Sequence, residues 1–268
     1  MPFAQLRDLA FYYELKGVGP RVLFISGTGG DLRRPPTAFD WPLAAHFTEL
    51  AYDQRGLGQS ARPDTLYSMA DFAADADGLM TALGWATCSV VGVSFGGMVA
   101  QEFALRYPGR VERLVLCCAS SGGVGGAAYP LHELSDLSPQ AYAAHTLGLF
   151  DTRRDTAWQT ASPAKSAGAL ADTMAAITFA AGEPGRAIGA RRQLDARRRH
   201  DAYARLPSLK VPTLICGGRY DGISPPANLE ALCRQIPGAR LAMFEGGHRF
   251  YFQDPAAFAC ILAFLGER

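Results

Sequence analysis

Residues 90–100 read VVGVSFGGMVA, and the interpretation of the whole chain starts from this stretch. An apolar, β-branched run ends at Ser94, and a helix-compatible run follows from Phe95 to Leu105. This strand–turn–helix context is the one required of a G-x-S-x-G nucleophile elbow. Gly92 and Gly96 flank the serine where a Cβ would collide, because strand and helix nearly touch there. The stretch therefore predicts a serine whose Oγ projects from the carboxyl end of a strand, at a helix N-terminus that favours negative charge.

The length and composition are those of an ordinary globular protein. The chain has 268 residues, of which 49% are hydrophobic and 19% are charged, and its formal net charge is +1. This length suits one large α/β domain with an insertion, or two small domains. The small net charge gives no argument for nucleic acid or an anionic membrane surface as a partner. We therefore expect a small-molecule substrate and a protein that is a monomer or a homodimer.

The cysteines and the N-terminal segment indicate the compartment. The first residues, MPFAQLRD, lack the basic and apolar parts of a signal peptide. The longest mostly apolar region, residues 88–105, is broken by polar residues and glycines, so a strand followed by a helix explains it better than a membrane span. No C-x-x-C pair is present, which argues against zinc and thioredoxin-type chemistry. We expect a cytoplasmic protein with no metal site and with free thiols at Cys88, Cys117, Cys118, Cys216, Cys233 and Cys260.

Strands and helices alternate on both sides of a central gap. Strands are predicted at residues 3–15 (a short pair), 21–26, 47–52, 88–93, 111–118, 211–216 and 239–244. Helices are predicted at residues 69–83, 95–106, 225–236 and 255–265. Repeated strand–helix units imply an α/β fold, with a mostly parallel, doubly wound sheet and helices on both faces.

The alternation stops from about residue 121 to about residue 206. This part begins with the flexible connector GGVGG at residues 122–126 and contains alanine-rich helical patches at 139–150 and 169–181. We therefore predict a helical cap over residues 121–206, inserted into an α/β core made of residues 1–120 and 207–268.

A base and an acid for the serine follow two later strands. A serine nucleophile needs a base, and the base needs a group that orients it. In a parallel sheet such groups meet at the carboxyl ends of the strands. There the chain places GGRYD at residues 217–221 and EGGH at residues 245–248. The sequence thus predicts Ser94 as nucleophile, Asp221 as orienter and His248 as general base and acid, in the Ser…Asp/Glu…His order of α/β-hydrolases.

The motifs together resemble those of α/β-hydrolases of the small esterase, lactonase and C–C-bond hydrolase type. The resemblance spans nearly the whole chain, through GVSFGG at 92–97, GGRYD at 217–221, GGH at 246–248 and DQRGLGQS at 53–60. It implies that residues 53–60 form an ordered turn in which Asp53 and Arg55 are structural, and that residues 121–206 are the family's cap. It implies no metal or organic cofactor.

The loop after the first long core strand departs from the family pattern. Members usually carry His-Gly-X there, whereas this chain has Ser26-Gly27-Thr28. The loop serves to offer a backbone N–H to the oxyanion, which does not depend on the side chain at position 26. We therefore expect an oxyanion hole formed by the N–H groups of Thr28 and Phe95, although Gly29 and Gly30 also offer donors.

The substrate pocket is less well defined by the sequence. Candidate lining residues are Gly29, Gly30, His132, Phe150 and Trp158. The two aromatic residues either form an apolar acyl pocket or hold the cap on the sheet. The arginine cluster at residues 191–199 is expected to be a solvated helix face, and its alternative role is to attract an anionic substrate.

The favoured function is a serine hydrolase acting on a small ester or lactone. A serine nucleophile argues against epoxide hydrolase and haloalkane dehalogenase activity, because those relatives use Asp. A C–C-bond hydrolase of a 1,3-dicarbonyl would use the same residues. Two further alternatives are a proline iminopeptidase and a non-catalytic ligand-binding protein on the same fold.

Overall fold

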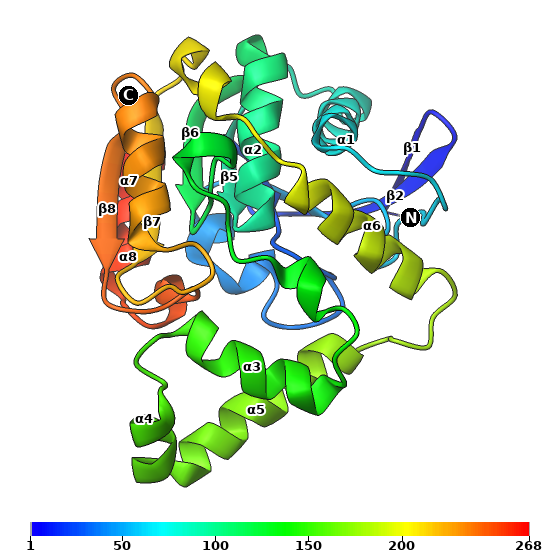
Figure 1. Ribbon diagram of the computed structural model, residues 1–268. Coiled ribbons are helices and arrows are strands. Elements are labelled where there is room, and N and C mark those ends of the chain that lie inside the picture. Colours follow the sequence, from blue (N-terminus) through cyan, green and yellow to red (C-terminus); the bar gives the residue numbers. More distant parts are fainter. Residues whose placement is uncertain (1, 268) are drawn as a thin grey trace.

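A computed structural model describes residues 2–267 and shows a single twisted sheet flanked by helices (Figure 1). The strand order is β1-β2-β4-β3-β5-β6-β7-β8. The strands are β1 (Phe3–Leu6), β2 (Leu9–Lys16), β3 (Arg21–Ile25), β4 (Thr48–Tyr52), β5 (Cys88–Val93), β6 (Val111–Cys117), β7 (Thr213–Gly218) and β8 (Arg240–Phe244). Pairing is antiparallel from β1 to β2 and from β2 to β4, and parallel everywhere else. The predicted mostly parallel α/β sheet is confirmed.

Alternate side chains of the central strands enter two separate cores. On one face Leu23 and Val90 pack with α1 (Met69–Ala82), α2 (Phe95–Arg106) and α7 (Pro226–Gln235). On the other face, Val22 and Val91 pack with α8 (Ala256–Leu265) and the 3-10 turns η1 (Ala38–Asp40) and η2 (Pro42–Ala45). Every residue of β5 is buried, as expected of a parallel strand covered on both faces. The nucleophile elbow therefore lies on the most enclosed part of the sheet.

Local signals in the sequence explain where α1 begins and ends. The Ser68 hydroxyl accepts a hydrogen bond from the Asp71 N–H (3.2 Å), and the Asp71 carboxylate accepts one from the Ser68 N–H (2.9 Å). This reciprocal capping box is the one that the sequence predicts. The helix stops before Gly84, which has φ of +67°.

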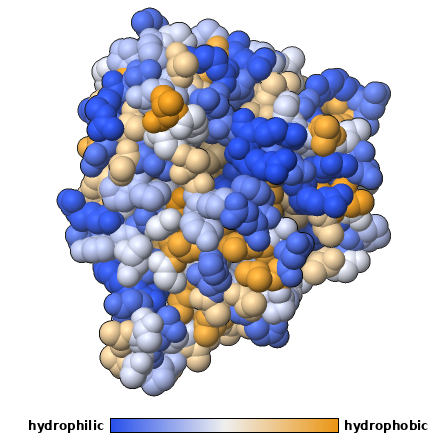
Figure 2. All heavy atoms as spheres, viewed as in Figure 1, coloured by the Kyte–Doolittle hydropathy of each residue, from blue (hydrophilic) through white to orange (hydrophobic). Residues whose placement is uncertain are grey.

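The segment between β6 and β7 is helical. It contains α3 (Pro139–Phe150), α4 (Thr156–Ala161), α5 (Pro163–Thr178) and α6 (Arg186–Arg198). Helix α3 has the predicted bounds, but α5 starts at Pro163 rather than at residue 169, because proline is favoured at the first position of a helix. In Figure 1, α3, α4 and α5 lie below the core, whereas α6 runs along it. Hydrophobic residues gather at the border between the core and α3–α5 (Figure 2).

Two further observations concern the described chain as a whole. No helix within residues 2–267 is both long and apolar enough to cross a bilayer. All six cysteines are free thiols, and Cys88, Cys117, Cys118 and Cys216 are buried.

Candidate active site

Ser94 lies at a strained turn between β5 and α2. Its φ is +56° and its ψ is −115°, a combination that non-glycine residues rarely adopt. A Cβ on Gly92 would lie 2.4 Å from the Gly96 oxygen, and one on Gly96 would lie 2.0 Å from the Ile25 oxygen. The Ser94 N–H donates to the Cys117 carbonyl (2.8 Å), which ties the turn to β6. The two flanking glycines are therefore required by close backbone approach, as the motif predicts.

The structure brings Ser94, Asp221 and His248 together, although they come from three separate loops. His248 Nε2 lies 2.9 Å from Ser94 Oγ, and His248 Nδ1 lies 2.8 Å from Asp221 Oδ2. The other oxygen of Asp221 accepts the N–H groups of Ile223 (2.7 Å) and Ser224 (2.9 Å), which fixes the carboxylate orientation. The exposed fractions of the three residues are 8%, 2% and 7%, respectively. Both distances are within the reach of a nucleophile, its base and an orienting acid.

Backbone hydrogen bonds join the end of α3 to the loops that carry Asp221 and His248. The His248 N–H donates to the Phe150 carbonyl (2.6 Å), and the Gly222 N–H donates to the Leu149 carbonyl (2.9 Å). In the opposite direction, the Thr152 N–H donates to the Tyr220 carbonyl (2.9 Å). Residues 149–152 thus extend the framework that positions His248, a feature with no sequence signal because it depends on how α3 meets the core.

Cys118 lies next to the triad, a position that the sequence pattern does not indicate. Ligand atoms of Cys118, Asp221 and His248 lie within 4.8 Å of one another, and the thiol is fully buried. Burial raises the pKa of this thiol well above its usual value. Because both ring nitrogens of His248 are engaged by Ser94 and Asp221, we interpret this group as a triad packed against a thiol rather than as a metal centre.

The loop after β3 presents its backbone next to Ser94. A Cβ on Gly27 would lie 3.4 Å from the Ser94 Cβ. The Gly30 N–H donates to the Gly27 carbonyl (3.2 Å), and the Gly29 N–H donates to Gln193 Oε1 (2.9 Å). Among residues 2–267, no acceptor is found for the Thr28 N–H. Of the three candidate donors in this loop, Thr28 is therefore the one left free.

Family members usually have a histidine at the position of Ser26, and its ring helps to order this loop. Here the side chain of Gln54 contacts the loop instead. Its Nε2 donates to the Ser26 carbonyl (2.8 Å), and its side chain is fully buried. A Cβ on Gly30 would lie 2.2 Å from Ser26 Oγ, so the loop folds tightly over a small side chain. The departure at position 26 is thus accompanied by a polar contact from the turn at residues 53–60.

The turn at residues 53–60 supports the site without contacting Ser94 or His248 by any hydrogen bond described for residues 2–267. Asp53 accepts the N–H groups of Leu32 and Gln59, both at 2.8 Å, and burial raises its pKa to about 6. Arg55 forms a buried two-pronged ion pair with Asp75 of α1, with N–O distances of 2.5 and 2.6 Å. Both residues have the structural roles that the sequence predicts.

A cavity of about 450 Å³ lies between the helices α3, α4 and α5 and the loop after β8, and Ser94, Asp221 and His248 are not among its lining residues. Phe150 and Trp158 line it, and the ring centroids of Phe150 and His248 are 5.9 Å apart. The remaining lining side chains include the cations Arg154, Lys165 and Arg249. The other predicted pocket residues, Gly29, Gly30 and His132, do not line this cavity. Gly29 and Gly30 belong to the loop beside Ser94, and the nearest ionic neighbour of His132 is Glu133 at 4.0 Å.

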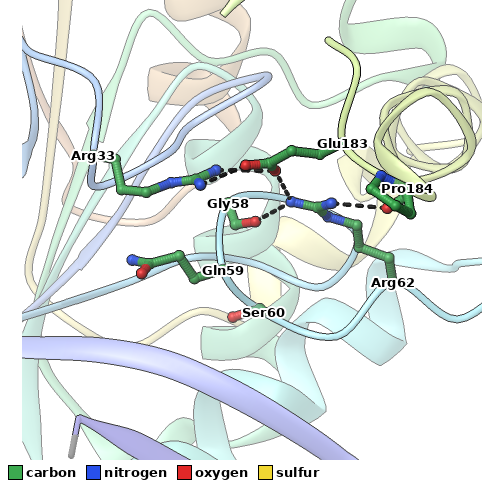
Figure 3. A pocket seen from close by; sticks show the side chains of 7 residues that line it. All are labelled: Arg33, Gly58, Gln59, Ser60, Arg62, Glu183 and Pro184. Carbon is green, nitrogen blue, oxygen red and sulfur yellow. Dashed lines mark hydrogen bonds and ion pairs between the residues drawn. The ribbon is translucent and has the colours of Figure 1, made fainter. Parts of the chain in front are cut away.

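A second pocket is open to solvent, has no triad residue in its lining, and is crossed by ion pairs (Figure 3). Glu183, from the segment before α6, pairs with Arg33 (2.6 Å) and with Arg62 of the core. These hydrogen bonds lower the pKa of Glu183 to about 2. Nearby, the buried Asp31 pairs with Arg33 and with Arg186, both at 2.8 Å. The pocket is therefore a junction between α6 and the core.

The arginine cluster at residues 191–199 is not uniformly solvated. Arg191, Arg198 and Arg199 are exposed, as expected. Arg197 is only 5% exposed, so the expectation of a solvated face is wrong for this residue. The buried face of α6 contains Gly189, Gln193, Ala196 and Arg197, whose spacing places them on one side of a helix. The residue types gave no apolar periodicity that would have indicated this burial.

Comparisons with known proteins agree with this architecture. A family model for the alpha/beta hydrolase fold matches residues 20–255. RutD of Azorhizobium caulinodans, a proposed carbamate hydrolase, is 30% identical over 276 residues, covering 100% of this chain and 99% of that protein. The poly(3-hydroxyalkanoate) depolymerase of Ectopseudomonas oleovorans is 29% identical over 251 residues, covering 90% of this chain and 82% of that protein.

A solved structure of similar shape is that of the meta-cleavage product hydrolase CumD from Pseudomonas fluorescens IP01. It matches with a TM-score of 0.77 at 25% identity, covering 99% of this chain and 98% of that one. The sheet order, the elbow and these matches place the chain in a family of hydrolases: it belongs to the α/β hydrolase fold family.

Proposed function

We propose that this protein is a serine hydrolase that cleaves a small ester or lactone through an acyl-enzyme on Ser94. The observation that carries the proposal is the continuous hydrogen-bond chain from Ser94 Oγ through His248 to Asp221, at 2.9 and 2.8 Å. Such a chain lets the imidazole take the serine proton while the carboxylate stabilises the imidazolium. Among the relatives, the poly(3-hydroxyalkanoate) depolymerase supports ester chemistry by its name.

The proposed reaction proceeds in two halves. Ser94 Oγ attacks the carbonyl carbon as its proton passes to His248 Nε2. The bond to the leaving oxygen then breaks, and that oxygen takes the proton from Nε2. Water attacks the acyl carbon and gives a proton to Nε2, which returns it to Ser94 Oγ as the acid leaves.

The proposed oxyanion donors are the N–H groups of Thr28 and Phe95. Phe95 is the first residue of α2, and first-turn N–H groups have no acceptor within their own helix. Two such donors hold the negative charge that develops on the carbonyl oxygen, and each is typically worth about 3–4 kcal/mol of transition-state stabilisation. In this proposal the helices between residues 121 and 206 act as the cap, and residues 1–120 and 207–268 form the catalytic core.

A C–C-bond hydrolase is the second candidate, because the fold match to the meta-cleavage product hydrolase CumD favours it. RutD adds carbamates to the carbonyl substrates worth testing. The same serine chemistry would serve all three bond types, so the choice depends on the pocket.

The test is the hydrolysis of p-nitrophenyl esters of increasing acyl length by the wild type and by Ser94→Ala. We expect turnover by the wild type, its loss in Ser94→Ala, and a length profile that measures the acyl pocket. Ser120→Ala is the matched control, since Ser120 is also buried but pairs with Ser224 (3.0 Å) instead of His248. If the esters are not hydrolysed while a fluorophosphonate labels Ser94, the result favours the C–C-bond hydrolase over the esterase. If neither turnover nor labelling occurs, the hydrolase proposal is wrong and the non-catalytic reading takes its place.

A further inference from the structure

The buried face of α6 presents a positive charge that no acidic side chain neutralises. Arg197 Nη1 donates to the Tyr129 carbonyl (2.6 Å), whereas its Nε and Nη2 are buried and have no hydrogen-bond partner among residues 2–267. None of the ion pairs described for that part of the chain includes Arg197. Burial lowers its pKa to about 10, which still leaves the guanidinium charged at neutral pH. An isolated buried charge is costly, so this arrangement needs an explanation.

One turn earlier, Gln193 presents a second unused donor on the same face. Its side chain is fully buried, and its Oε1 accepts the N–H of Gly29 at 2.9 Å. Its Nε2 has no partner among residues 2–267. Because residues four apart lie on the same side of a helix, the Gln193 amide and the Arg197 guanidinium are neighbours.

Both residues are linked by hydrogen bonds to segments that lead to the triad. Gln193 holds Gly29, in the loop that abuts the nucleophile. Arg197 holds Tyr129, whose own N–H donates to the Ile223 carbonyl (2.7 Å). Ile223 in turn donates to Asp221 Oδ1. The face of α6 between Gln193 and Arg197 therefore spans from the proposed oxyanion loop to the loop of the triad acid.

The surroundings of Arg197 are mostly apolar, and the phenol of Tyr142, in the same cluster, is the titratable group that interacts with its charge. Tyr129 and Leu194, which are its neighbours in the fold and on α6, belong to a small hydrophobic cluster with Ile223 and Phe150. Donors set in an apolar wall bind an anionic group more strongly than donors in water do, and a guanidinium and a carboxylate match in a two-pronged geometry.

We propose that Arg197 and Gln193 form a subsite for a carboxylate carried by the substrate. The substrate class is then an ester or lactone with an acidic group, held by the guanidinium and the amide while Ser94 attacks the carbonyl. This inference rests on the proposed serine-hydrolase function and narrows it. It also explains why a cation stays buried on α6 without a partner from the chain.

The test compares matched anionic and neutral esters. With the carboxylate in the acyl part, the pair is p-nitrophenyl hemisuccinate and its isostere p-nitrophenyl 4-methylpentanoate. With the carboxylate in the alcohol part, the pair is 4-butyryloxybenzoate and its methyl ester. We expect the wild type to prefer the anionic member of one pair. Arg197→Met should lower kcat/KM for that member by roughly 10- to 100-fold, and that for the neutral one by less than about threefold.

Three further variants make the result specific. Gln193→Glu keeps an acceptor for the Gly29 N–H but places a carboxylate beside Arg197, so it should lose the anionic preference and melt at a higher temperature. Arg197→Lys keeps the charge and should retain part of the preference. Arg198→Met, on the exposed face of the same helix, should change nothing.

Failure of this inference is distinguishable from failure of the hydrolase proposal. If neutral esters are turned over in a Ser94-dependent way but no anionic ester is preferred, or Arg197→Met affects both members of a pair equally, the carboxylate subsite is wrong and the hydrolase stands. If no ester is turned over, the carboxylate subsite is tested by binding. Isothermal titration measures the affinity of Ser94→Ala for the same esters. Tighter binding of an anionic member, by about tenfold and dependent on Arg197, supports the subsite, and equal binding overturns it.

Discussion

At the scale of single residues, Glu49 makes stability depend on pH. This carboxyl on β4 is fully buried, and burial raises its pKa from 4.5 to about 8, although the charge of Lys16 acts in the opposite direction. Between these values the unfolded chain releases the proton while the folded chain keeps it. The free energy of unfolding therefore falls as pH rises from about 4.5 to 8, because the unfolded state binds fewer protons.

Glu49→Gln is expected to remove this dependence. The variant should be more stable than the wild type at pH 8 by roughly 2–4 kcal/mol, and the difference should shrink towards pH 4.5. Urea unfolding at several pH values measures it, with the exposed Glu112→Gln as control. Parallel pH profiles for wild type and Glu49→Gln would contradict the assignment.

At the scale of elements, the elbow depends on the contact between α2 and the end of β3. Gly96→Ala would place a Cβ 2.0 Å from the Ile25 oxygen and 2.6 Å from the Ser26 oxygen, and backbone atoms cannot move aside easily. We expect the variant to lose roughly 2–4 kcal/mol of unfolding free energy and the proposed ester hydrolysis. Gly109→Ala, whose added Cβ meets nothing within 4 Å, should change stability by less than about 0.5 kcal/mol. Similar melting temperatures for the two variants would show that the elbow tolerates a Cβ.

Elements are also the level at which the sequence was most informative. Strand β5 and helix α2 have the predicted bounds, because a β-branched run and a helical run meet at glycines that fix the turn. Asp221 and His248 could be placed beside Ser94 because parallel strands end at one edge of the sheet. The side-chain contacts of Gln54 and Gln193 could not be predicted, since they join segments far apart in the chain.

The same limit explains the error at Arg197. Five arginines within residues 191–199 look like a solvated surface, and only the packing of α6 against two loops separates the buried one from its exposed neighbours. Residues 149–152 likewise reach Tyr220, Gly222 and His248 through backbone groups, which carry no sequence-specific signal.

At the scale of the whole molecule, Asp31 joins α6 to the core. Burial alone would raise its pKa, but hydrogen bonds from Arg33 and then from Arg186 outweigh burial and lower it to about 2. The unfolded chain binds its proton near pH 4, so this stabilisation is present above that pH and is lost as pH falls towards 2. It amounts to about 2 kcal/mol at neutral pH.

Asp31→Asn is therefore expected to loosen α6 at neutral pH. Hydrogen exchange across residues 186–198 should become faster, and the free energy of unfolding should fall by roughly 2–4 kcal/mol. Asp64→Asn removes the exposed partner of Arg192 on the same helix and should cost less than about 1 kcal/mol. Unchanged exchange in Asp31→Asn would mean that other contacts hold α6 in place.

The backbone bonds at residues 149–152 have a consequence for the exchange of parts between relatives. Consider a chimaera in which another protein's segment replaces residues 121–206. The carbonyls of Leu149 and Phe150, which accept from Gly222 and His248, are then replaced as well. If the new segment does not place carbonyls at the same positions, substrate preference and the proposed proton transfer through His248 would change together. A graft that keeps residues 149–152 native leaves these backbone hydrogen bonds in place, and it should also keep Gln193, whose side chain holds Gly29. The helical segment between β6 and β7 is therefore better exchanged as two parts, on either side of residues 149–152, than as one.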